Sequence, residues 1–429
     1  MFRCQKVLEA RDKLVNSYSR FLPPNSLKFL CSLDNNPRSL DPAKFYIIPK
    51  IHKSPIAGRP IAASHSYITR PISIFVDELV KPSITMPTVL RDSGELIQCL
   101  EKFELPANCL LVTADVSSLY PNIDTKKAFI ALDLLLREGK VVHTPLFVQF
   151  ARLIFENNFI KSEFSSDIYH QNFGIAMGTP FAVTAANAFM YYHERDIVQS
   201  YSRYLALYKR FIDDLFVIWD GPREILLEFL LAFNTKDERI KITYEISERT
   251  ISFLDLLLFK VDGCTTLHYS TFQKPLNKNL YIPYESFHPG SNKKAFIKGA
   301  LIRYARNSST FHSFSETLML LWKRLRLRGY PTKFLLPIFR EINYSYTSST
   351  LTNPRTLILT QNFTLNQAGI RQGKTPTSRK TCIRFVRSYL RTKATINHIG
   401  KIIYPVKNVV VLETSRTMRQ FVYSLLTKT

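Results

Sequence analysis

The chain has 429 residues, 45% hydrophobic and 21% charged, which is ordinary for a globular protein with a core divided among two or three subdomains. Lys and Arg number 58 against 34 Asp and Glu, and the formal net charge of +24 favours a polyanionic partner, either nucleic acid or an acidic membrane surface. No apolar run approaches the ~18 residues of a membrane span, and residues 1–10 carry charge where a signal peptide needs an apolar core. These features predict a soluble intracellular protein.

The positive charge is concentrated in the last third of the sequence. Residues 291–429 contain 25 Lys or Arg against three acids and so carry +22 of the net charge of +24. Aromatic and aliphatic residues recur throughout this segment, which favours a folded basic module that follows a phosphate backbone over a disordered tail. The six cysteines form no CxxC pair, which predicts free thiols in a reducing compartment.

The first part of the chain predicts helices and then a basic β-hairpin. Residues 1–40 are expected to be mainly helical, and residues 45–61 to form two strands around a turn at Gly58. Lys50, Lys53 and Arg59 belong to this hairpin. They can hold a triphosphate or simply be solvated, and Arg59 is the stronger candidate because Pro60 fixes the backbone beside it.

An acid ends the next predicted strand. Residues 109–120 include an apolar run that reaches Asp115, and a carboxylate at the end of a buried strand is either capped by backbone donors or bound to a cation. Helices are expected on both sides, over 67–110 with proline breaks and over 125–160. In the second of these, the apolar spacing makes Ile130 and Leu134 core residues.

A glycine loop follows at residues 174–180. Thr179 is a good N-cap and Pro180 a good first helical residue, so the loop is expected to open a helix. The small residues around Gly178 would let something flat, such as a base pair, lie close to the backbone. The same pattern suits an ordinary glycine turn before an Ala-packed helix.

Two adjacent acids, Asp213 and Asp214, lie between apolar runs at 205–208 and 215–219, which predicts strand, tight turn, strand. Adjacent carboxylates repel, and a hard divalent cation such as Mg²⁺ turns that charge into a binding site. A solvated hairpin tip is the alternative for the pair taken alone. Together with Asp115 and the glycine loop, the pair supplies the parts of a two-metal nucleotidyl transferase, in which cations lower the pKa of a primer 3′-hydroxyl and stabilise the leaving pyrophosphate.

The remaining chain predicts a helix, three strands and then basic helices. The helix is expected at 223–233 and the strands at 241–246, 251–260 and 267–273. From residue 291 the pattern is helical and basic up to a break at 329–331. A loose linker is expected at 342–380 and a last basic helix at 384–391.

The order of these parts resembles that of the reverse transcriptases, from about Phe45 to Pro289. Lys50–Pro60 looks like the fingers motif of that family, Ala114–Tyr120 like its first catalytic motif, Gly174–Pro180 like its second and Phe211–Asp214 like its catalytic box. Within the family the sequence is similar to the Penelope-like retroelements, a group related to telomerase. The phrases that carry this closer resemblance are Ala176–Pro180, Lys209–Asp214, Ser252–Asp255, Gln273–Pro275 and Ser286–Pro289.

The resemblance implies an α+β fold of the right-hand polymerase type, with fingers, a palm of antiparallel sheet and helices, and a basic, mostly helical thumb. It implies an N-terminal helical extension at 1–40, fingers and palm at 41–290, and the thumb with a C-terminal nucleic-acid-binding region at 291–429. The implied activity is that of an RNA-directed DNA polymerase of a retroelement. Its partners would be an RNA template, a DNA primer and dNTPs, its cofactor two Mg²⁺ ions with Mn²⁺ as a substitute, and its location the nucleus, with no membrane.

Roles carried over from the family fall on particular residues. The implied catalytic residues and metal ligands are Asp115, Asp213 and, less directly engaged, Asp214. Tyr120 would exclude a 2′-hydroxyl, although a core aromatic role is the alternative. The other implied nucleotide contacts are Lys50, Arg59, Met177 and Gly178, and the implied primer contacts are Phe211, Gln273 and Lys274. Lys241 is a candidate proton donor to the pyrophosphate, and Asp255 is expected to be structural.

The sequence departs from the family pattern in three respects. Phe211 and Met177 stand where many reverse transcriptases have tyrosine and glutamine. The lack of a GIY-YIG nuclease motif predicts priming from a pre-existing 3′ end.

Two other functions fit parts of the sequence. An RNA-dependent RNA polymerase shares the metal chemistry, but Tyr120 disfavours it because that enzyme must accept a 2′-hydroxyl. A catalytically inactive or domesticated RNA-binding protein would use the charge of residues 291–429, and the presence of all three acids weighs against it.

Overall fold

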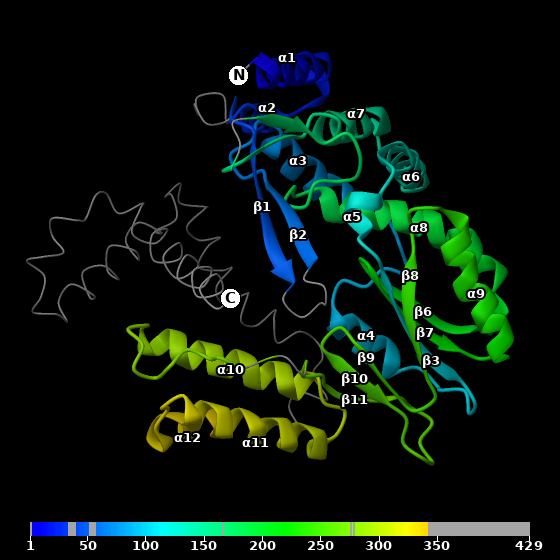
Figure 1. Ribbon diagram of the computed structural model, residues 1–429, viewed down its shortest axis with the longest axis vertical. Coiled ribbons are helices and arrows are strands. Elements are labelled where there is room, and N and C mark those ends of the chain that lie inside the picture. Colours follow the sequence, from blue (N-terminus) through cyan, green and yellow to red (C-terminus); the bar gives the residue numbers. More distant parts are fainter. Residues whose placement is uncertain are drawn as a thin grey trace, which may run out of the picture. The chain divides into compact units, whose positions relative to one another are not determined.

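The computed structural model describes residues 2–32, 40–50, 57–164, 167–274, 277 and 279–341 (Figure 1). Contacts divide the chain into two compact units, Met1–Tyr281 with Phe296–Ser348, and Ile282–Ala295 with Ser349–Thr429. The predicted site residues lie in the first unit. Helices and antiparallel sheets both build this unit, so the α+β prediction is confirmed. The domain boundaries expected near residues 40 and 290 stay predictions.

A four-stranded antiparallel sheet forms the core of the first unit. Its strands, in spatial order, are β6 (Leu205–Phe211), β7 (Asp214–Trp219), β3 (Leu110–Val116) and β8 (Ile242–Ser247). The inner strands β3 and β7 have largely apolar sequences, which suit burial on both faces. The predicted strand that reaches Asp115 and the predicted acidic hairpin are therefore both found.

Different layers cover the two faces of this sheet. On one face lie α8 (Ala182–Ser200) and α9 (Arg223–Lys236), and the buried Trp219 ring packs against Phe229 of α9 with centroids 5.4 Å apart. On the other face, Phe216 packs against Phe253 of a second sheet, also at 5.4 Å between centroids. Phe216 and Trp219, three positions apart on β7, thus pack against different layers, because strand residues alternate between faces.

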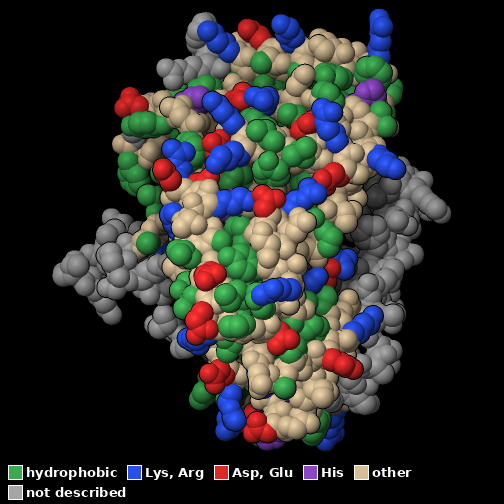
Figure 2. Space-filling model, turned by 90° about the vertical axis from the view of Figure 1, so that its right-hand side faces the viewer, with side chains coloured by type: hydrophobic (Ala, Val, Ile, Leu, Met, Phe, Trp, Pro, Cys, Tyr) green, Lys and Arg blue, Asp and Glu red, His purple; other side chains and the backbone are tan. Residues whose placement is uncertain are grey.

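The helical side of the molecule carries charges of both signs interspersed with apolar side chains (Figure 2).

Helix α6 (Thr125–Glu138) packs beside α8, and Glu138 pairs with Arg195 of α8 at 2.8 Å. The expectation that Ile130 and Leu134 are core residues is wrong, since they are 53% and 38% exposed. The apolar stripe of α6 is wider than the face that it buries.

The second sheet contains β9 (Thr250–Phe253), β10 (Leu256–Phe259) and β11 (His268–Thr271), in the order β11-β10-β9. The prediction of one strand over 251–260 is wrong, because the segment is a hairpin that turns at Leu254 and Asp255. Leu254 has a φ of 54°, a conformation that favours glycine or asparagine. With neither residue at the turn, the apolar run gives no signal of it.

The predicted basic hairpin is formed by β1 (Ala43–Lys50) and β2 (Ala57–Ala63), in a sheet with β4 (Phe159–Ser162) and β5 (Ile168–His170). The predicted turn at Gly58 is wrong, because Gly58 lies within β2 opposite Pro49. A Cβ at Gly58 would lie 2.4 Å from Cγ2 of Ile47, so glycine permits close packing across the hairpin. Lys53 lies outside the described residues.

The other helices of the first part of the chain are α1 (Phe2–Ser17), α2 (Pro24–Leu30), α3 (Arg70–Val80), α4 (Ser93–Leu100), α5 (Leu119–Asn122) and α7 (Thr144–Phe155), with 3₁₀ turns at Ser19–Phe21 and Ser202–Tyr204. Pro71 lies in the first turn of α3, where proline starts a helix rather than breaking one. None of the described helices is both long and apolar enough to cross a membrane.

Three helices follow the second sheet in the chain: α10 (Gly290–Arg306), α11 (Phe311–Leu327) and α12 (Thr332–Arg340). The segment between α10 and α11 is bound to the second sheet. Asn307 donates from Nδ2 to Oδ2 of Asp255 at 2.7 Å, and the Ser309 N–H donates to the Tyr269 carbonyl at 2.9 Å. The linker expected at 342–380 and the helix expected at 384–391 lie outside the described residues.

Candidate functional site

The three predicted catalytic acids lie at one end of the central sheet. Asp115, next to the last residue of β3, is the cross-strand partner of Asp214, the first residue of β7. Asp213 occupies the turn between β6 and β7, and its carbonyl accepts a hydrogen bond from the Val116 N–H at 2.9 Å. Antiparallel pairing of β3 with β7 therefore brings together acids that are about 100 residues apart in sequence.

The electrostatics of this end of the sheet depend on the three carboxylates acting on one another. Burial, with smaller contributions from the negative charges of Asp213 and Asp115, raises the pKa of Asp214 to about 6, and the positive charge of Lys274 opposes part of this rise. Burial and the charge of Asp213 also raise the pKa of Tyr120 to about 12. The phenol is therefore neutral at physiological pH and lies within the field of the acids.

The donor chemistry of this acidic end suits a hard cation, because all three side chains offer carboxylate oxygens. As they stand, however, no three His, Cys, Asp or Glu side chains of the described residues are grouped closely enough to hold an ion. A bound ion would have to draw the carboxylates inward. The raised pKa of Asp214 comes first from burial and then from the charges of Asp213 and Asp115, and a bound cation would offset both of these costs of the charged form.

The glycine loop binds the segment that carries Tyr120. The Ile175 N–H donates to the Tyr120 carbonyl at 2.8 Å. Gly174 has a φ of 76°, and a Cβ there would lie 2.6 Å from the Pro121 carbonyl oxygen, so only glycine allows this approach. Tyr120 itself is half-buried on α5, directly after β3.

The other end of the loop is bound to strand β2. The Ala62 N–H donates to the Met177 carbonyl at 2.9 Å, and Ser64 Oγ donates to the Gly178 carbonyl at 2.8 Å. Gly178 has a φ of 123°, and a Cβ there would lie 2.3 Å from the Ala62 carbonyl oxygen. The loop thus connects β2, which carries Arg59, with the segment that carries Tyr120.

The expected cap of the following helix is wrong. Helix α8 begins at Ala182, and Thr179 makes no side-chain cap to it. Instead, Ser73 of α3 accepts a hydrogen bond from the Phe181 N–H through Oγ at 2.9 Å. A residue about 100 positions away therefore supplies the acceptor that the sequence pattern assigned to Thr179.

Lys50 and Arg59 lie on the β1–β2 hairpin, where Lys50 pairs with Ala57 and the exposed Arg59 pairs with Ile48. Among the described residues, no hydrogen bond or ion pair joins either side chain to the acids. Neither side chain therefore contacts the acids directly, and the role of Lys50 and Arg59 as nucleotide contacts stays a prediction.

The predicted primer contacts are closer to the acids. Phe211 is the cross-strand neighbour of Asp214, and Lys274 lies near enough for its charge to lower the pKa of Asp214. Gln273 accepts a hydrogen bond through Oε1 from Nη1 of Arg324 in α11, at 2.5 Å. The segment after β11 thus contacts both the acidic end of the sheet and the helix α11. Pro275 lies outside the described residues.

Lys241 is not directed at the acids. Its ammonium donates to the carbonyls of Asn234 and Asp237 near the end of α9. Sequence reasoning also missed a buried ion pair next to the acidic turn, formed by Glu194 of α8 and Arg210 of β6. Glu194 lies among His193, Arg195 and Asp196, and Arg210 follows Lys209, so the residue pattern gives no signal that these two side chains are buried together.

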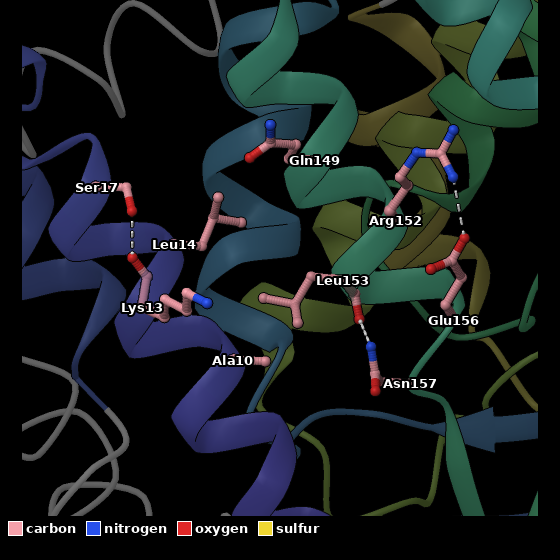
Figure 3. A pocket seen from close by; sticks show the side chains of 9 residues that line it. All are labelled: Ala10, Lys13, Leu14, Ser17, Gln149, Arg152, Leu153, Glu156 and Asn157. Atoms are coloured by element: carbon pink, nitrogen blue, oxygen red, sulfur yellow. Dashed lines mark hydrogen bonds and ion pairs between the residues drawn. The ribbon is translucent and has the colours of Figure 1, made fainter.

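One surface groove lies away from this site. It has a volume of about 340 Å³ and lies between α1 and α7, with side chains such as Lys13 and Arg152 along it (Figure 3). Its polar groups make local contacts, for example Arg152 with Glu156 at 3.4 Å. None of the predicted site residues lines it.

Comparisons with known proteins give limited matches. The sequence model of a family described as an animal helix-turn-helix domain matches residues 280–340, the region of α10, α11 and α12. No curated protein matches the sequence.

Similar solved structures are polymerases. Telomerase from Candida albicans with a fragment of telomeric RNA has a TM-score of 0.48 and 10% identity, covering 73% of this chain and 61% of that one. Telomerase from Candida tropicalis with the corresponding fragment has a TM-score of 0.45 and 12% identity, covering 85% of this chain and 64% of that one. The RNA-dependent RNA polymerase of a human picobirnavirus has a TM-score of 0.48 and 11% identity, covering 71% of this chain and 61% of that one. The chain therefore spans less than two thirds of each, and at TM-scores below 0.5 no property of these proteins is carried over.

Proposed function

We propose that the chain is a nucleic-acid polymerase, and more narrowly an RNA-directed DNA polymerase. The observation that carries the proposal is the pairing of Asp115 with Asp214 across β3 and β7, with Asp213 in the adjoining turn. Nucleotidyl transfer needs carboxylates at one point to gather divalent cations around the reacting oxygens. The neutral Tyr120 and the cationic Lys274 beside these acids supply groups for a sugar and a phosphate.

In this proposal Mg²⁺ is held chiefly by Asp115 and Asp213, with Asp214 adjacent. When bound, the ions would supply positive charge that acidifies a primer 3′-hydroxyl and stabilises pyrophosphate. The chain's own residues orient the substrates. Gly178 is exposed and would contact the base pair, and Lys50 and Arg59 on the β1–β2 hairpin would neutralise a triphosphate.

The sugar is selected by Tyr120 in this proposal. The hydrogen bond from the Ile175 N–H to the Tyr120 carbonyl fixes the main chain that carries the ring, and a bulky ring beneath the sugar would exclude a 2′-hydroxyl. This feature favours dNTPs over rNTPs and so favours DNA synthesis over RNA synthesis. On the primer side, Phe211, Gln273 and Lys274 would contact the strand end.

The narrower identity is that of a Penelope-like retroelement protein, supported by the motifs quoted above. Such a protein would work in the nucleus, with an RNA template and a DNA primer that already has a free 3′ end. The basic helices α10, α11 and α12 would bind the sugar-phosphate backbone. Extension that began only after the protein itself had cut an intact duplex would contradict this identity.

The test is extension of a DNA primer on an RNA template with dNTPs or rNTPs, in Mg²⁺ and then Mn²⁺. We expect DNA synthesis by the wild type and none by Asp213→Asn. Tyr120→Ala should use rNTPs more readily than the wild type does. RNA synthesis in preference to DNA would indicate an RNA-dependent RNA polymerase. No synthesis, with tight and salt-sensitive RNA binding, would indicate a non-catalytic RNA-binding protein.

A further inference from the structure

An ion pair is buried directly behind the acidic turn. Arg210, the last but one residue of β6, donates from Nε to Oε2 of Glu194 in α8 at 2.7 Å. The two side chains are 0% and 1% exposed. A buried ion pair contributes little net stability, because the cost of taking both charges out of water offsets their attraction. Stability therefore does not account for this pair, and its place directly behind the acidic turn is the feature to explain.

The turn next to this pair has an unfavourable backbone conformation. Ile212, the first residue of the two-residue turn, has a φ of 57°. A β-branched residue in the left-handed region costs roughly 1–2 kcal/mol, and glycine is the usual residue where a hairpin turn needs positive φ. This conformation persists only if neighbouring groups hold it.

Arg210 supplies that hold. Its Nη1 donates to the Ile212 carbonyl at 2.9 Å, so the guanidinium reaches from the ion pair to the strained peptide of the turn. The same Nη1 donates to Oδ1 of Asn187 at 2.9 Å, and Nη2 donates to the Asn187 carbonyl at 3.2 Å. The guanidinium therefore connects α8 with the turn that carries Asp213.

Glu194 is held in place in turn. Tyr208 donates from its hydroxyl to Oε2 and Thr88 from Oγ1 to Oε1, both at 3.0 Å. The main chain of Arg210 is fixed as well, since its N–H donates to the Thr88 carbonyl at 2.8 Å and its carbonyl accepts from the Leu90 N–H at 2.7 Å. Because the main chain and the guanidinium of Arg210 are both fixed, its hydrogen bond to the Ile212 carbonyl has a defined direction.

We propose that Glu194 and Arg210 are positioning residues that hold the strained turn and so keep Asp213 beside the cross-strand pair of Asp115 and Asp214. The inference rests on the proposed polymerase function for its kinetic consequence, but the hold on the turn can be measured without any activity. Arg210 does not itself touch substrate in this account. It acts through the Ile212 carbonyl.

The test removes both charges together, because removing one would leave the other buried and unpaired. The variant is Glu194→Gln with Arg210→Met. A matched control is Glu138→Gln with Arg195→Met, which removes an exposed pair between α6 and the residue that follows Glu194 in α8. A second variant, Arg210→Lys, keeps a charge for Glu194 but lacks the planar fork that reaches the turn.

Two measurements are made on each protein. The first is primer extension, where we expect kcat of the double variant to fall roughly 10- to 100-fold with an unchanged Kd for template and primer and a near wild-type melting temperature. The second is hydrogen exchange, where we expect the amides of residues 211–215 to exchange faster in the double variant than in the wild type or the control. Restored slow exchange on adding Ile212→Gly to the double variant would support the account, because glycine adopts positive φ freely.

Each outcome decides the proposal. A folded double variant with wild-type kcat and wild-type exchange at 211–215 would overturn it. If the double variant does not fold, Arg210→Lys takes its place with the same expected results. If the wild type has no polymerase activity, the proposed function fails, and exchange at 211–215 still supports or overturns the hold on the turn.

Discussion

Two hairpins of the molecule have almost the same turn and different surroundings. The β6–β7 hairpin turns at Ile212 and Asp213, and the β9–β10 hairpin turns at Leu254 and Asp255, each after a phenylalanine. The φ values of Ile212 and Leu254 are 57° and 54°. In both hairpins the carbonyl of the turn aspartate accepts a 2.9 Å hydrogen bond from a neighbouring segment.

The two hairpins differ in the residues next to the turn aspartate. In the first, Asp214 follows and is paired with Asp115 of β3. In the second, Leu256 follows and is paired with Thr271 of β11. The Asp255 carboxylate accepts a hydrogen bond from Asn307 instead of facing other acids. The backbone turn alone therefore places one aspartate, and the additional acids turn that position into a candidate site.

The largest effect should come from making the first hairpin resemble the second. Asp115→Thr removes the acid opposite Asp214, and we expect kcat to fall about 10³-fold, since the charge stabilisation lost is several kcal/mol. The measurement is single-turnover primer extension. Thr271→Val is the control in the second sheet, where the buried hydroxyl has no hydrogen-bond partner in the described part of the chain, so its removal should leave kcat and the melting temperature near wild type. Equal rates for the two variants would contradict the comparison.

A smaller effect should come from the partner of Asp255. Asn307→Ala leaves the Asp255 carboxylate without its 2.7 Å donor, and we expect the free energy of unfolding to fall by about 1.5–3 kcal/mol. Urea denaturation measures this change. The single-turnover rate of the folded variant should stay near that of the wild type. A loss of rate without a loss of stability would show that Asp255 takes part in the chemistry.

The smallest effect concerns pH. The pKa of Asp214 is raised to about 6 in the folded protein, above its value in the unfolded chain, so its contribution to stability is present at low pH and is lost as pH rises through about 6. In EDTA, Asp214→Asn should abolish this loss, which is on the order of 1 kcal/mol after allowance for solvent screening. Thermal melts from pH 4 to 8 measure it. Identical pH profiles for variant and wild type would contradict the raised pKa of Asp214, which comes from burial and then from the neighbouring acids.

The sequence predicts much of this arrangement because the strands are apolar runs, and Asp115, Asp213 and Asp214 stand out at their ends. The strand that reaches Asp115 and the hairpin that carries Asp213 are both found as predicted. The turn at Leu254 was missed because a leucine at positive φ gives no turn signal, and the capping of α8 by Ser73 was missed because the acceptor comes from a distant helix. The Glu194–Arg210 pair depends on tertiary contact between a helix and a strand, which residue patterns do not contain.

The most direct test compares one isosteric change in each turn. Asp213→Asn and Asp255→Asn are made in the same chain and assayed by single-turnover extension of a DNA primer on RNA with dNTPs and Mg²⁺. The account predicts that Asp213→Asn loses about 10³-fold or more in rate, whereas Asp255→Asn stays within about twofold of wild type. Undiminished synthesis by a folded Asp213→Asn variant would contradict the assignment of the acidic turn as the catalytic site.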